Sequence, residues 1–179
     1  MTVSDVLKGT NLYLIGMMGC GKTTVGQIVA QQLGYRFFDT DAVIEQVAGQ
    51  SVRDIFAILG EPGFRDLESQ VLAELSAYTR LAIATGGGIV LRRENWSYLR
   101  HGIVIWLDVP LNQLQTRLQS DTSRPLLAAE DLPTRLQTLL NQRRSLYAQA
   151  DVQVTYRSGV SPEQMANQVI QHLQQVVKG

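Results

Sequence analysis

The amino-acid sequence predicts an α/β protein in which a central five-stranded parallel sheet is flanked by helices on both faces, giving a three-layer α/β/α architecture. One observation is that short apolar runs alternate along the chain with amphipathic segments of helical periodicity, as in repeated βαβ units. The other is a glycine-rich loop, residues 16–23, which joins the first apolar run to the first helical segment. Since ligands in such folds bind beyond the carboxyl ends of the strands, we expect the functional residues at that edge.

The individual elements follow from the periodicity of the apolar residues. Strands are expected at short apolar or alternating runs, which are residues 12–15, 35–38, 81–84, 103–107 and 152–155. Helices are expected where apolar residues recur every three to four positions, in residues 22–33, 41–48, 51–59, 63–78, 92–100, 111–119, 132–148 and 162–177. The polar stretch 120–131, interrupted by Pro125, is expected to be a loop, and a loop of this length inside a domain often forms a lid.

Composition limits the classes to which the chain can belong. Its 179 residues, 45% of them hydrophobic, fit one domain spanning residues 1–179. Basic and acidic residues number 16 each, so we expect no general attraction to nucleic acid or to acidic membranes. No apolar run approaches the roughly 20 residues of a membrane helix. The mixed start and the single cysteine lead us to expect a cytoplasmic protein, although a mature plastid protein without its transit segment would share these features.

The loop Gly16-Met-Met-Gly-Cys-Gly-Lys-Thr23 matches the G-x-x-x-x-G-K-T phosphate-binding pattern in its required context, between a strand and a helix. Its glycines allow backbone N–H groups to approach phosphate oxygens, and the helix N-terminus adds partial positive charge. Lys22 can reach the β- and γ-phosphates, and the Thr23 hydroxyl can ligate Mg²⁺. Because a chance glycine-rich turn rarely coincides with all these features, we expect the chain to bind a nucleoside triphosphate. Residues 16–23 are called the phosphate loop below.

Carboxylates follow two of the expected strands. Asp39 and Asp41 come after the second strand, and their spacing of two would point both side chains to one side of an extended chain. They could divide Mg²⁺ binding and activation of an acceptor hydroxyl between them, or Asp41 could only cap the helix that follows it. Asp108 follows the fourth strand and could either hold the metal or cap the helix after Pro110. The residues alone leave both Asp39 and Asp108 open as the metal-side carboxylate.

Glycines and an arginine supply candidate contacts for a second, anionic ligand. Residues 86–88 are three glycines directly after the third strand, where the absence of side chains lets a ligand or another backbone approach closely. Arg143 lies on an apolar stripe of the expected helix 132–148, so it needs an anionic partner or must reach solvent. Its neighbour Arg144 lies on a polar stripe of the same helix, and we expect it to be a solvated surface residue.

Two further arginines have both a functional and an ordinary interpretation. Arg65 lies four residues after Glu61 and three before Glu68, a spacing that helix ion pairs explain without any ligand. Arg124 lies beside Pro125 in the expected lid, where it could close over a transferring phosphate or be an exposed loop charge. In a chain without net charge, a few placed arginines of this kind are the means of holding an anionic substrate.

Taken together, these motifs resemble those of shikimate kinases over nearly the whole chain. The match is carried, in order, by Gly16-Met-Met-Gly-Cys-Gly-Lys-Thr-Thr-Val-Gly26, Phe38-Asp-Thr-Asp41, Gly60-Glu61, Phe64-Arg65, Glu68, Gly86-Gly87-Gly88, Arg124-Pro-Leu-Leu127, Arg143 and Tyr147. The resemblance implies a P-loop kinase fold with a mobile lid at 120–131 and a helical substrate-binding region at about residues 39–68. It also implies transfer of the γ-phosphate of ATP to the 3-hydroxyl of shikimate, on the route to chorismate and the aromatic amino acids.

The resemblance further implies the ligands and the residues on the nucleotide side. ATP and shikimate would bind to a monomer. One Mg²⁺ ion would be held by Thr23 and by Asp39, largely through water. This choice favours Asp39 over Asp108 as the metal-side carboxylate. Lys22 would neutralise the transferring phosphate, and Arg124 would swing in with the lid. The nucleotide contacts would be Gly16, Met17, Met18, Gly19, Cys20, Gly21, Lys22, Thr23, Thr24, Arg117, Arg124 and Pro162, the last opposite Arg117 across the adenine.

The acceptor side is implied in the same way. Asp41 would bind the shikimate hydroxyls and position or activate the attacking one. Arg65 and Arg143 would clamp the carboxylate of shikimate. The backbone of the three glycines would hold a hydroxyl, and the ring would be lined by Phe64 and Met18. The complete acceptor-side set is Asp41, Phe64, Arg65, Gly86, Gly87, Gly88 and Arg143, and the catalytic set is Lys22, Asp41 and Arg124.

Three rival classes share part of this pattern. A nucleoside monophosphate kinase would have the phosphate loop and the lid, but Asp39-Thr-Asp41 and the three glycines argue against it. A GTPase is disfavoured because an Asn-Lys-x-Asp motif is absent, the lysines being Lys8, Lys22 and Lys178. A non-catalytic relative kept for binding or regulation is the third alternative, and the presence of all the candidate residues argues against it.

Overall fold

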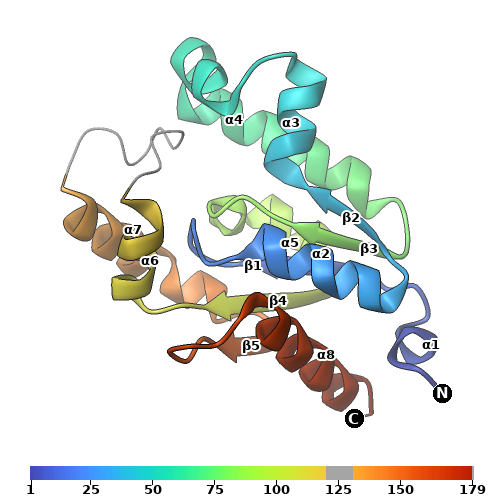
Figure 1. Ribbon diagram of the computed structural model, residues 1–179. Coiled ribbons are helices and arrows are strands. Elements are labelled where there is room, and N and C mark those ends of the chain that lie inside the picture. Colours follow the sequence, from blue (N-terminus) through green and yellow to red (C-terminus); the bar gives the residue numbers. More distant parts are fainter. Residues whose placement is uncertain (120–130, 179) are drawn as a thin grey trace.

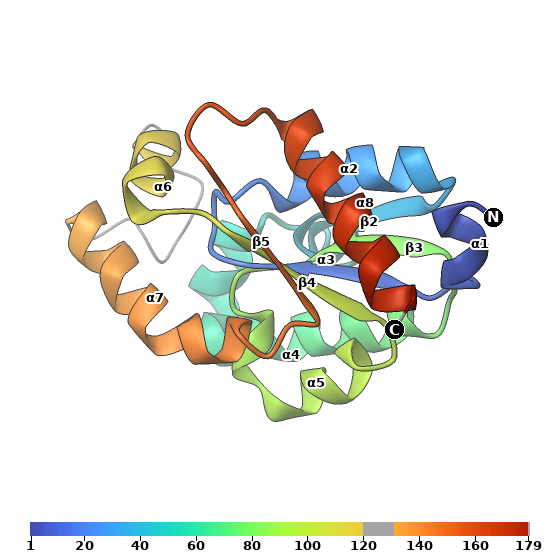
Figure 2. The ribbon, with the colours of Figure 1, turned by 90° about the horizontal axis from the view of Figure 1, so that it is seen from below.

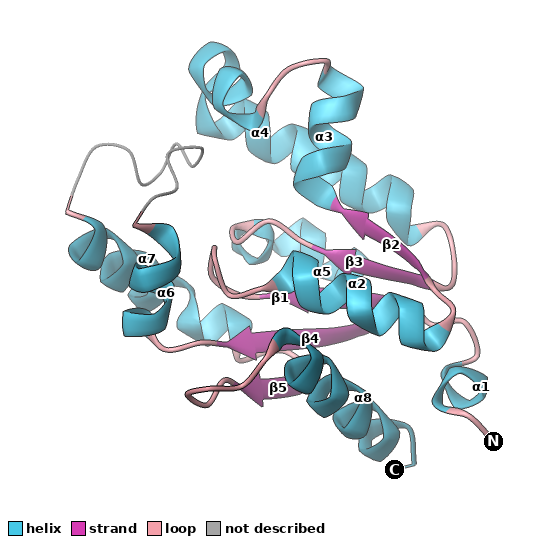
Figure 3. Ribbon diagram, viewed as in Figure 1, coloured by secondary structure: helices cyan, strands magenta, loops and turns pink. Residues whose placement is uncertain are grey.

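The computed structural model describes residues 1–119 and 131–178, and its centre is one five-stranded sheet (Figures 1 and 3). The strands are β1 (Leu12–Ile15), β2 (Arg36–Asp39), β3 (Leu81–Ala84), β4 (Ile103–Asp108) and β5 (Val152–Thr155). Their order in the sheet is β2-β3-β1-β4-β5, and every neighbouring pair is parallel. All five carboxyl ends therefore lie at one edge of the sheet, where the sequence predicts the site.

Helices cover both faces of this sheet (Figure 2). One face carries α1 (Val3–Leu7), α2 (Lys22–Leu33) and α8 (Pro162–Lys178). The other face carries α4 (Val52–Ser76), the 3-10 helix η1 (Ile89–Leu91), α5 (Arg93–Leu99) and α7 (Leu132–Tyr147). The helices α3 (Thr40–Ala48) and α6 (Leu111–Leu118) begin just after the ends of β2 and β4. The predicted three-layer α/β/α fold is confirmed, and no helix of the described residues is long and apolar enough to span a bilayer.

Burial follows the position of each strand. Every residue of β1 and β3 is buried, because helices cover these inner strands on both faces. The edge strand β5 instead alternates between buried and exposed residues. The continuous apolar runs that predicted the inner strands therefore reflect burial on two faces rather than one.

The structure differs from the predicted elements at three places along the first half of the chain. The helices expected at 51–59 and 63–78 form one element, α4, which is bent at Gly60, where φ is 68° and ψ is −179°. The short helix α1 was not predicted. Its N-terminus is stabilised by a capping box, in which the side chains of Thr2 and Asp5 each accept a hydrogen bond from the other residue's backbone N–H. The strand β2 begins one residue later than expected, because the N–H of Tyr35 still donates to Ala30 at the end of α2.

A buried asparagine joins three segments at the amino ends of the strands. Asn11, just before β1, donates from Nδ2 to the carbonyl of Tyr78 at 2.8 Å. Its Oδ1 accepts from the N–H of Leu81, the first residue of β3, at 2.9 Å. Its backbone carbonyl accepts from the N–H of Ile103, the first residue of β4. One residue therefore fixes the amino ends of three adjacent strands in register.

We expect Asn11→Leu to lower the free energy of unfolding by about 1–3 kcal/mol, because it leaves a buried backbone N–H at Leu81 without an acceptor. Urea denaturation followed by circular dichroism measures the change. The matched control is Asn141→Leu, on the exposed surface of α7, for which a change within about 0.5 kcal/mol is expected. Equal losses in the two variants would contradict the structural importance of Asn11.

Candidate active site

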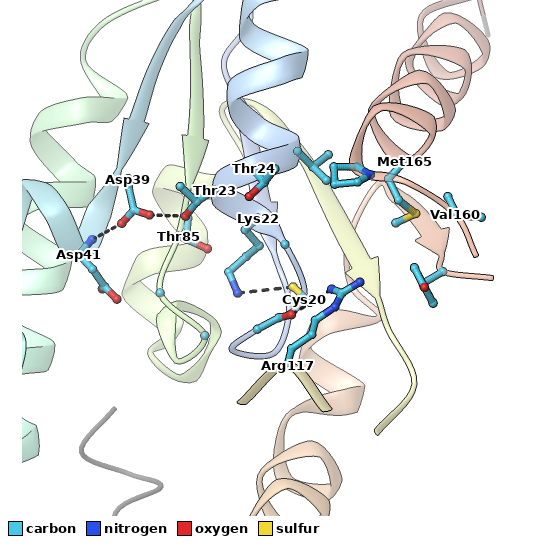
Figure 4. A pocket seen from close by; sticks show the side chains of 17 residues that line it. Cys20, Lys22, Thr23, Thr24, Asp39, Asp41, Thr85, Arg117, Val160 and Met165 are labelled. Atoms are coloured by element: carbon cyan, nitrogen blue, oxygen red, sulfur yellow. Dashed lines mark hydrogen bonds between the residues drawn. The ribbon is translucent and has the colours of Figure 1, made fainter. Parts of the chain in front are cut away.

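A cavity of about 470 Å³ lies at the carboxyl edge of the sheet (Figure 4). Its lining residues come from segments that are far apart in the sequence and fall into three groups. The first group is Gly19, Cys20, Gly21, Lys22, Thr23, Thr24 and Val25, from the phosphate loop and α2. The second group is Asp39, Asp41, Thr85, Gly86 and Gly87, from the ends of β2 and β3. The third group is Arg117, Tyr156, Val160, Pro162 and Met165.

The backbone of the phosphate loop requires its glycines. Gly16, Gly19 and Gly21 have φ values of 145°, 80° and 97°, in the region that residues with a side chain rarely adopt. A Cβ at Gly16 would lie 2.8 Å from the carbonyl oxygen of Leu107 in β4, so the loop also passes too close to the sheet for any side chain. Gly21 is the N-cap of α2, and the positive end of this helix dipole therefore faces the cavity.

Lys22 lies inside the phosphate loop. Its Nζ donates to the carbonyl oxygens of Gly16 at 2.7 Å and Met17 at 2.9 Å, and the residue is only 9% exposed. No carboxylate of the described residues pairs with this ammonium group. The positive charge is therefore available to an anion bound at the loop.

Asp39 connects the phosphate loop to α3. Its Oδ2 accepts a hydrogen bond from the Thr23 hydroxyl at 2.6 Å, and its Oδ1 accepts from the N–H groups of Asp41 and Ala42 (Figure 4). Asp39 is thus the N-cap of α3, and the alternative that Asp41 caps this helix is wrong. The expected extended alignment of the two carboxylates is also wrong, because Asp41 is in the first turn of α3. Both nevertheless line the cavity.

Thr23 and Asp39 have the chemistry of a magnesium site. A hydroxyl and a carboxylate oxygen, already within hydrogen-bond distance of each other, are hard donors of the kind that Mg²⁺ prefers. Among the described residues there is no group of three or more His, Cys, Asp or Glu that could hold a metal. The pair fits an ion that takes its remaining ligands from phosphate and water.

Asp108 lies outside the cavity and does not cap α6. Its Oδ2 accepts from Nε2 of Gln153 in β5 at 2.9 Å, and it does not line the cavity. The N-cap of α6 is Pro110, so Asp108 does not cap that helix. Its carboxylate joins β4 to the edge strand β5 instead.

The three glycines after β3 pack against charged side chains. A Cβ at Gly86 would lie 2.7 Å from Oε2 of Glu68 and 3.0 Å from Oδ1 of Asp41. A Cβ at Gly87 would lie 3.2 Å from Nη1 of Arg143, and a Cβ at Gly88 would overlap the guanidinium of Arg65. Any side chain at these positions would therefore displace the charges. We call Asp41, Arg65, Glu68 and Arg143 the buried charge cluster.

Arg65 is held by two glutamates of its own helix. Its Nη1 donates to Glu68 at 2.9 Å, and its Nη2 donates to Glu61 at 3.2 Å. Glu68 is completely buried, and this burial raises the pKa of its carboxyl. The positive charge of Arg65 lowers this pKa, and the negative charge of Asp41 raises it further. The helix ion pairs that the spacing predicts are therefore present. The pair with Glu68 lies within the buried charge cluster, whereas Glu61 reaches Arg65 from the surface with a side chain that is 47% exposed.

Arg143 is the most unusual side chain of the site. It is 2% exposed, and its Nε and Nη1 are buried without a hydrogen-bond partner among the described residues. A buried cation with unsatisfied donors is costly, so such a group indicates a place for an anion. The expected contrast with Arg144 is present, since Arg144 is exposed and lies over the ring of Trp106.

Tyr147, one turn after Arg143, fixes the glycine backbone. Its hydroxyl donates to the carbonyl oxygen of Gly87 at 2.7 Å. Burial raises the pKa of Tyr147 to about 12, so the phenol keeps its proton and remains a donor. This contact between α7 and the end of β3 could not be found from sequence spacing, although Tyr147 is part of the motif that carries the family resemblance.

The far end of the cavity has the features of a base-binding site. Arg117 donates from Nη1 to the carbonyl of Gly19, and its guanidinium lies 5.2 Å from the ring centroid of Tyr156. Pro162 lines the same cavity, as expected. Tyr156 was not predicted from the sequence, because it follows β5 and no local pattern distinguishes it from a surface tyrosine.

The remaining expected residues lie in different places. Met17, Met18 and Phe64 are buried outside the cavity lining, and Phe64 packs against Phe56 with ring centroids 4.6 Å apart. Thr24, which is exposed, and Cys20, which is buried, both line the cavity. Residues 120–130 of the expected lid, including Arg124, lie outside the described residues. The structure thus brings together the phosphate loop, the two aspartates and the glycines.

Comparison with known proteins gives matches along nearly the whole chain. A family model described as "Shikimate kinase" matches residues 18–174. The shikimate kinase of Nostoc sp. (strain PCC 7120) is 56% identical, covering 98% of this chain and 97% of that protein. The structure of shikimate kinase from Acinetobacter baumannii in complex with shikimate has a TM-score of 0.92 and 36% identity, covering 97% of each chain. A gluconokinase from Sinorhizobium meliloti 1021 shares the fold alone. It is 17% identical with a TM-score of 0.58, and the match covers 95% of this chain and 94% of that chain.

These findings agree with the motifs recognised in the sequence. The family model spans most of the chain, from within the phosphate loop to the last helix. The matches to these relatives cover nearly the full length of the chain, so they include the segments that hold the nucleotide side and the buried charge cluster. The chain belongs to the shikimate kinase family.

Proposed function

We propose that this protein is an ATP-dependent shikimate kinase, which transfers the γ-phosphate of ATP to the 3-hydroxyl of shikimate and gives shikimate 3-phosphate and ADP. The product would enter the synthesis of chorismate and the aromatic amino acids. The observation that carries the proposal is Arg143, a buried cation with two N–H donors lacking partners among the described residues, placed against Gly87 and near the phosphate loop. A carboxylate satisfies such donors best, and shikimate is a carboxylate with hydroxyls on its ring.

In this proposal the acceptor lies over the glycines after β3. Arg143 and Arg65 hold its carboxylate, and Gly86, Gly87 and Gly88 leave room for the ring and offer backbone groups to a hydroxyl. Asp41 accepts a hydrogen bond from the 3-hydroxyl. Phe64 and Met18, buried beside these residues, supply the apolar contact with the ring.

ATP in turn occupies the cavity of about 470 Å³. The backbone N–H groups of the phosphate loop and Lys22 bind the phosphates, and the base lies between Arg117 and Pro162. We assign one Mg²⁺ to Thr23 and Asp39; when bound, this ion neutralises phosphate charge and aligns the transferring group. The loop glycines and the N-terminus of α2 allow close approach without side-chain interference.

The transfer step requires alignment and charge neutralisation more than covalent help from the protein. Asp41 takes the proton of the 3-hydroxyl while this oxygen forms a bond to the γ-phosphorus. The bond between the γ-phosphorus and the bridging oxygen of ADP breaks, and Lys22 stabilises the charge that moves onto the phosphoryl oxygens. We assign to Arg124 a further contact with these oxygens. We also propose that the protein acts as a monomeric single domain in the cytoplasm.

The proposal is tested by ADP release from Mg·ATP, with and without shikimate, in a coupled assay. We expect strong dependence on shikimate, because the acceptor hydroxyl is the nucleophile. Asp41→Asn should lower kcat by about 10²- to 10⁴-fold, the usual contribution of a general base. ADP formation indifferent to shikimate would contradict the proposal, and an absence of turnover with ATP still bound would favour a non-catalytic relative.

We expect Arg143→Ala to raise KM for shikimate by at least about 30-fold, equivalent to about 2 kcal/mol, because a charge-assisted contact to the carboxylate is lost. The KM for ATP should change little, since Arg143 does not line the cavity. Arg144→Ala is the matched control, because the adjacent arginine is exposed and should leave both constants unchanged. Steady-state kinetics measure the two KM values. An unchanged KM for shikimate in Arg143→Ala would contradict the assignment of Arg143 to the carboxylate of shikimate.

A further inference from the structure

We propose that Glu61 competes with the carboxylate of the acceptor for Arg65, and that this competition sets how strongly the site selects an anionic acceptor. The inference rests on the proposed function, since it requires Arg65 to bind the acceptor carboxylate. It concerns a glutamate that does not line the cavity of about 470 Å³ and that the transfer step does not use. Its effect is on affinity and selectivity rather than on the chemistry.

The two glutamates bound to Arg65 differ in their freedom to leave. Glu68 is fully buried, contacts Nη1 of Arg65 at 2.9 Å and packs against Gly86. Moving it away would leave an empty space next to the buried charge of Arg65. Glu61 has a 47% exposed side chain and contacts Nη2 at the longer distance of 3.2 Å. A rotation of the Glu61 side chain places its carboxylate in water, since nearly half of this side chain is already exposed, and Arg65 keeps its contact with Glu68. Glu68 is therefore the permanent partner of Arg65, and Glu61 is the exchangeable one.

The donor pattern of Arg65 favours this exchange. Nε of Arg65 is buried and has no hydrogen-bond partner among the described residues. In a guanidinium, the Nε–H and one Nη2–H lie along the same edge and form a fork that matches the two oxygens of a carboxylate. Glu61 accepts from Nη2 alone, so it uses one arm of the fork. An acceptor carboxylate that displaces Glu61 can use both arms, which gives it an advantage over the side chain that it replaces.

The bend in α4 explains why Glu61 reaches Arg65. Gly60, with φ of 68° and ψ of −179°, interrupts the helix, and Glu61 begins its second half. Glu61 and Arg65 are four residues apart on this half, so they lie on the same side of one helical turn. A Cβ at Gly63 would overlap the Cβ of Leu59, so the two halves are packed closely at the bend. The backbone therefore holds Glu61 near the arginine while leaving its carboxylate in contact with solvent.

The test compares Glu61→Gln with the parent protein, using shikimate and its primary-alcohol analogue, in which CH₂OH replaces the carboxylate. We expect KM for shikimate to fall about two- to five-fold, because the competing partner of Arg65 is removed, with kcat and KM for ATP unchanged. The ratio of kcat/KM for shikimate to kcat/KM for the alcohol should rise by the same factor, because only the acid competes with Glu61.

Two further variants complete the experiment. Glu94→Gln is the matched control, since Glu94 is an exposed glutamate paired with Arg92 outside the site, and it should change nothing. Glu61→Asp keeps the negative charge but shortens the side chain, so it should reproduce part of the fall in KM and covers the case in which Glu61→Gln unfolds. An unchanged or raised KM in both Glu61 variants, or an equal fall in Glu94→Gln, would overturn the inference. Failure of the parent protein to use shikimate would instead overturn the proposed function.

Discussion

The candidate site depends on the close packing of buried charges against a backbone that has no side chains. Arg65 and Glu68 from α4, Asp41 from α3 and Arg143 from α7 all meet residues 86–88 after β3. A methyl group at any of these three glycines would contact a charged atom of this cluster too closely. The cluster therefore fixes the positions of three helices relative to the end of one strand. Opposite charges within it reduce the free-energy cost of burying each charge.

Much of this arrangement could be predicted from the sequence because it is encoded locally. Continuous apolar runs marked β1 and β3, and the phosphate loop was recognisable from glycine spacing and its position between a strand and a helix. The apolar stripe of α7 correctly distinguished Arg143, which is buried, from Arg144, which is exposed. The carboxyl edge followed from the parallel order of the strands. The residue roles carried over from the family resemblance stay predictions.

The features that could not be predicted depend on contacts between distant parts of the chain. Asp108 bonds to Gln153, and Tyr147 bonds to the carbonyl of Gly87, 60 residues away. The N-cap of α3 is Asp39 rather than Asp41, because the helix begins at Thr40, two residues earlier than a helix capped by Asp41 would. Nothing in the spacing of Asn11 indicates that it joins the starts of β3 and β4. In each case the sequence offers a polar residue, and only the tertiary fold selects its partner.

The two oxygens of Asp39 have one further consequence. One accepts from Thr23 at the start of α2, and the other caps α3, the helix that carries Asp41. A ligand that binds Thr23 and reorients this carboxylate therefore also changes the stability of the first turn of α3. Thermodynamic linkage makes such a coupling reciprocal. If one ligand changes the affinity for the other by some factor, the second changes the affinity for the first by the same factor. A single carboxylate thus connects the phosphate loop to the helix that carries Asp41.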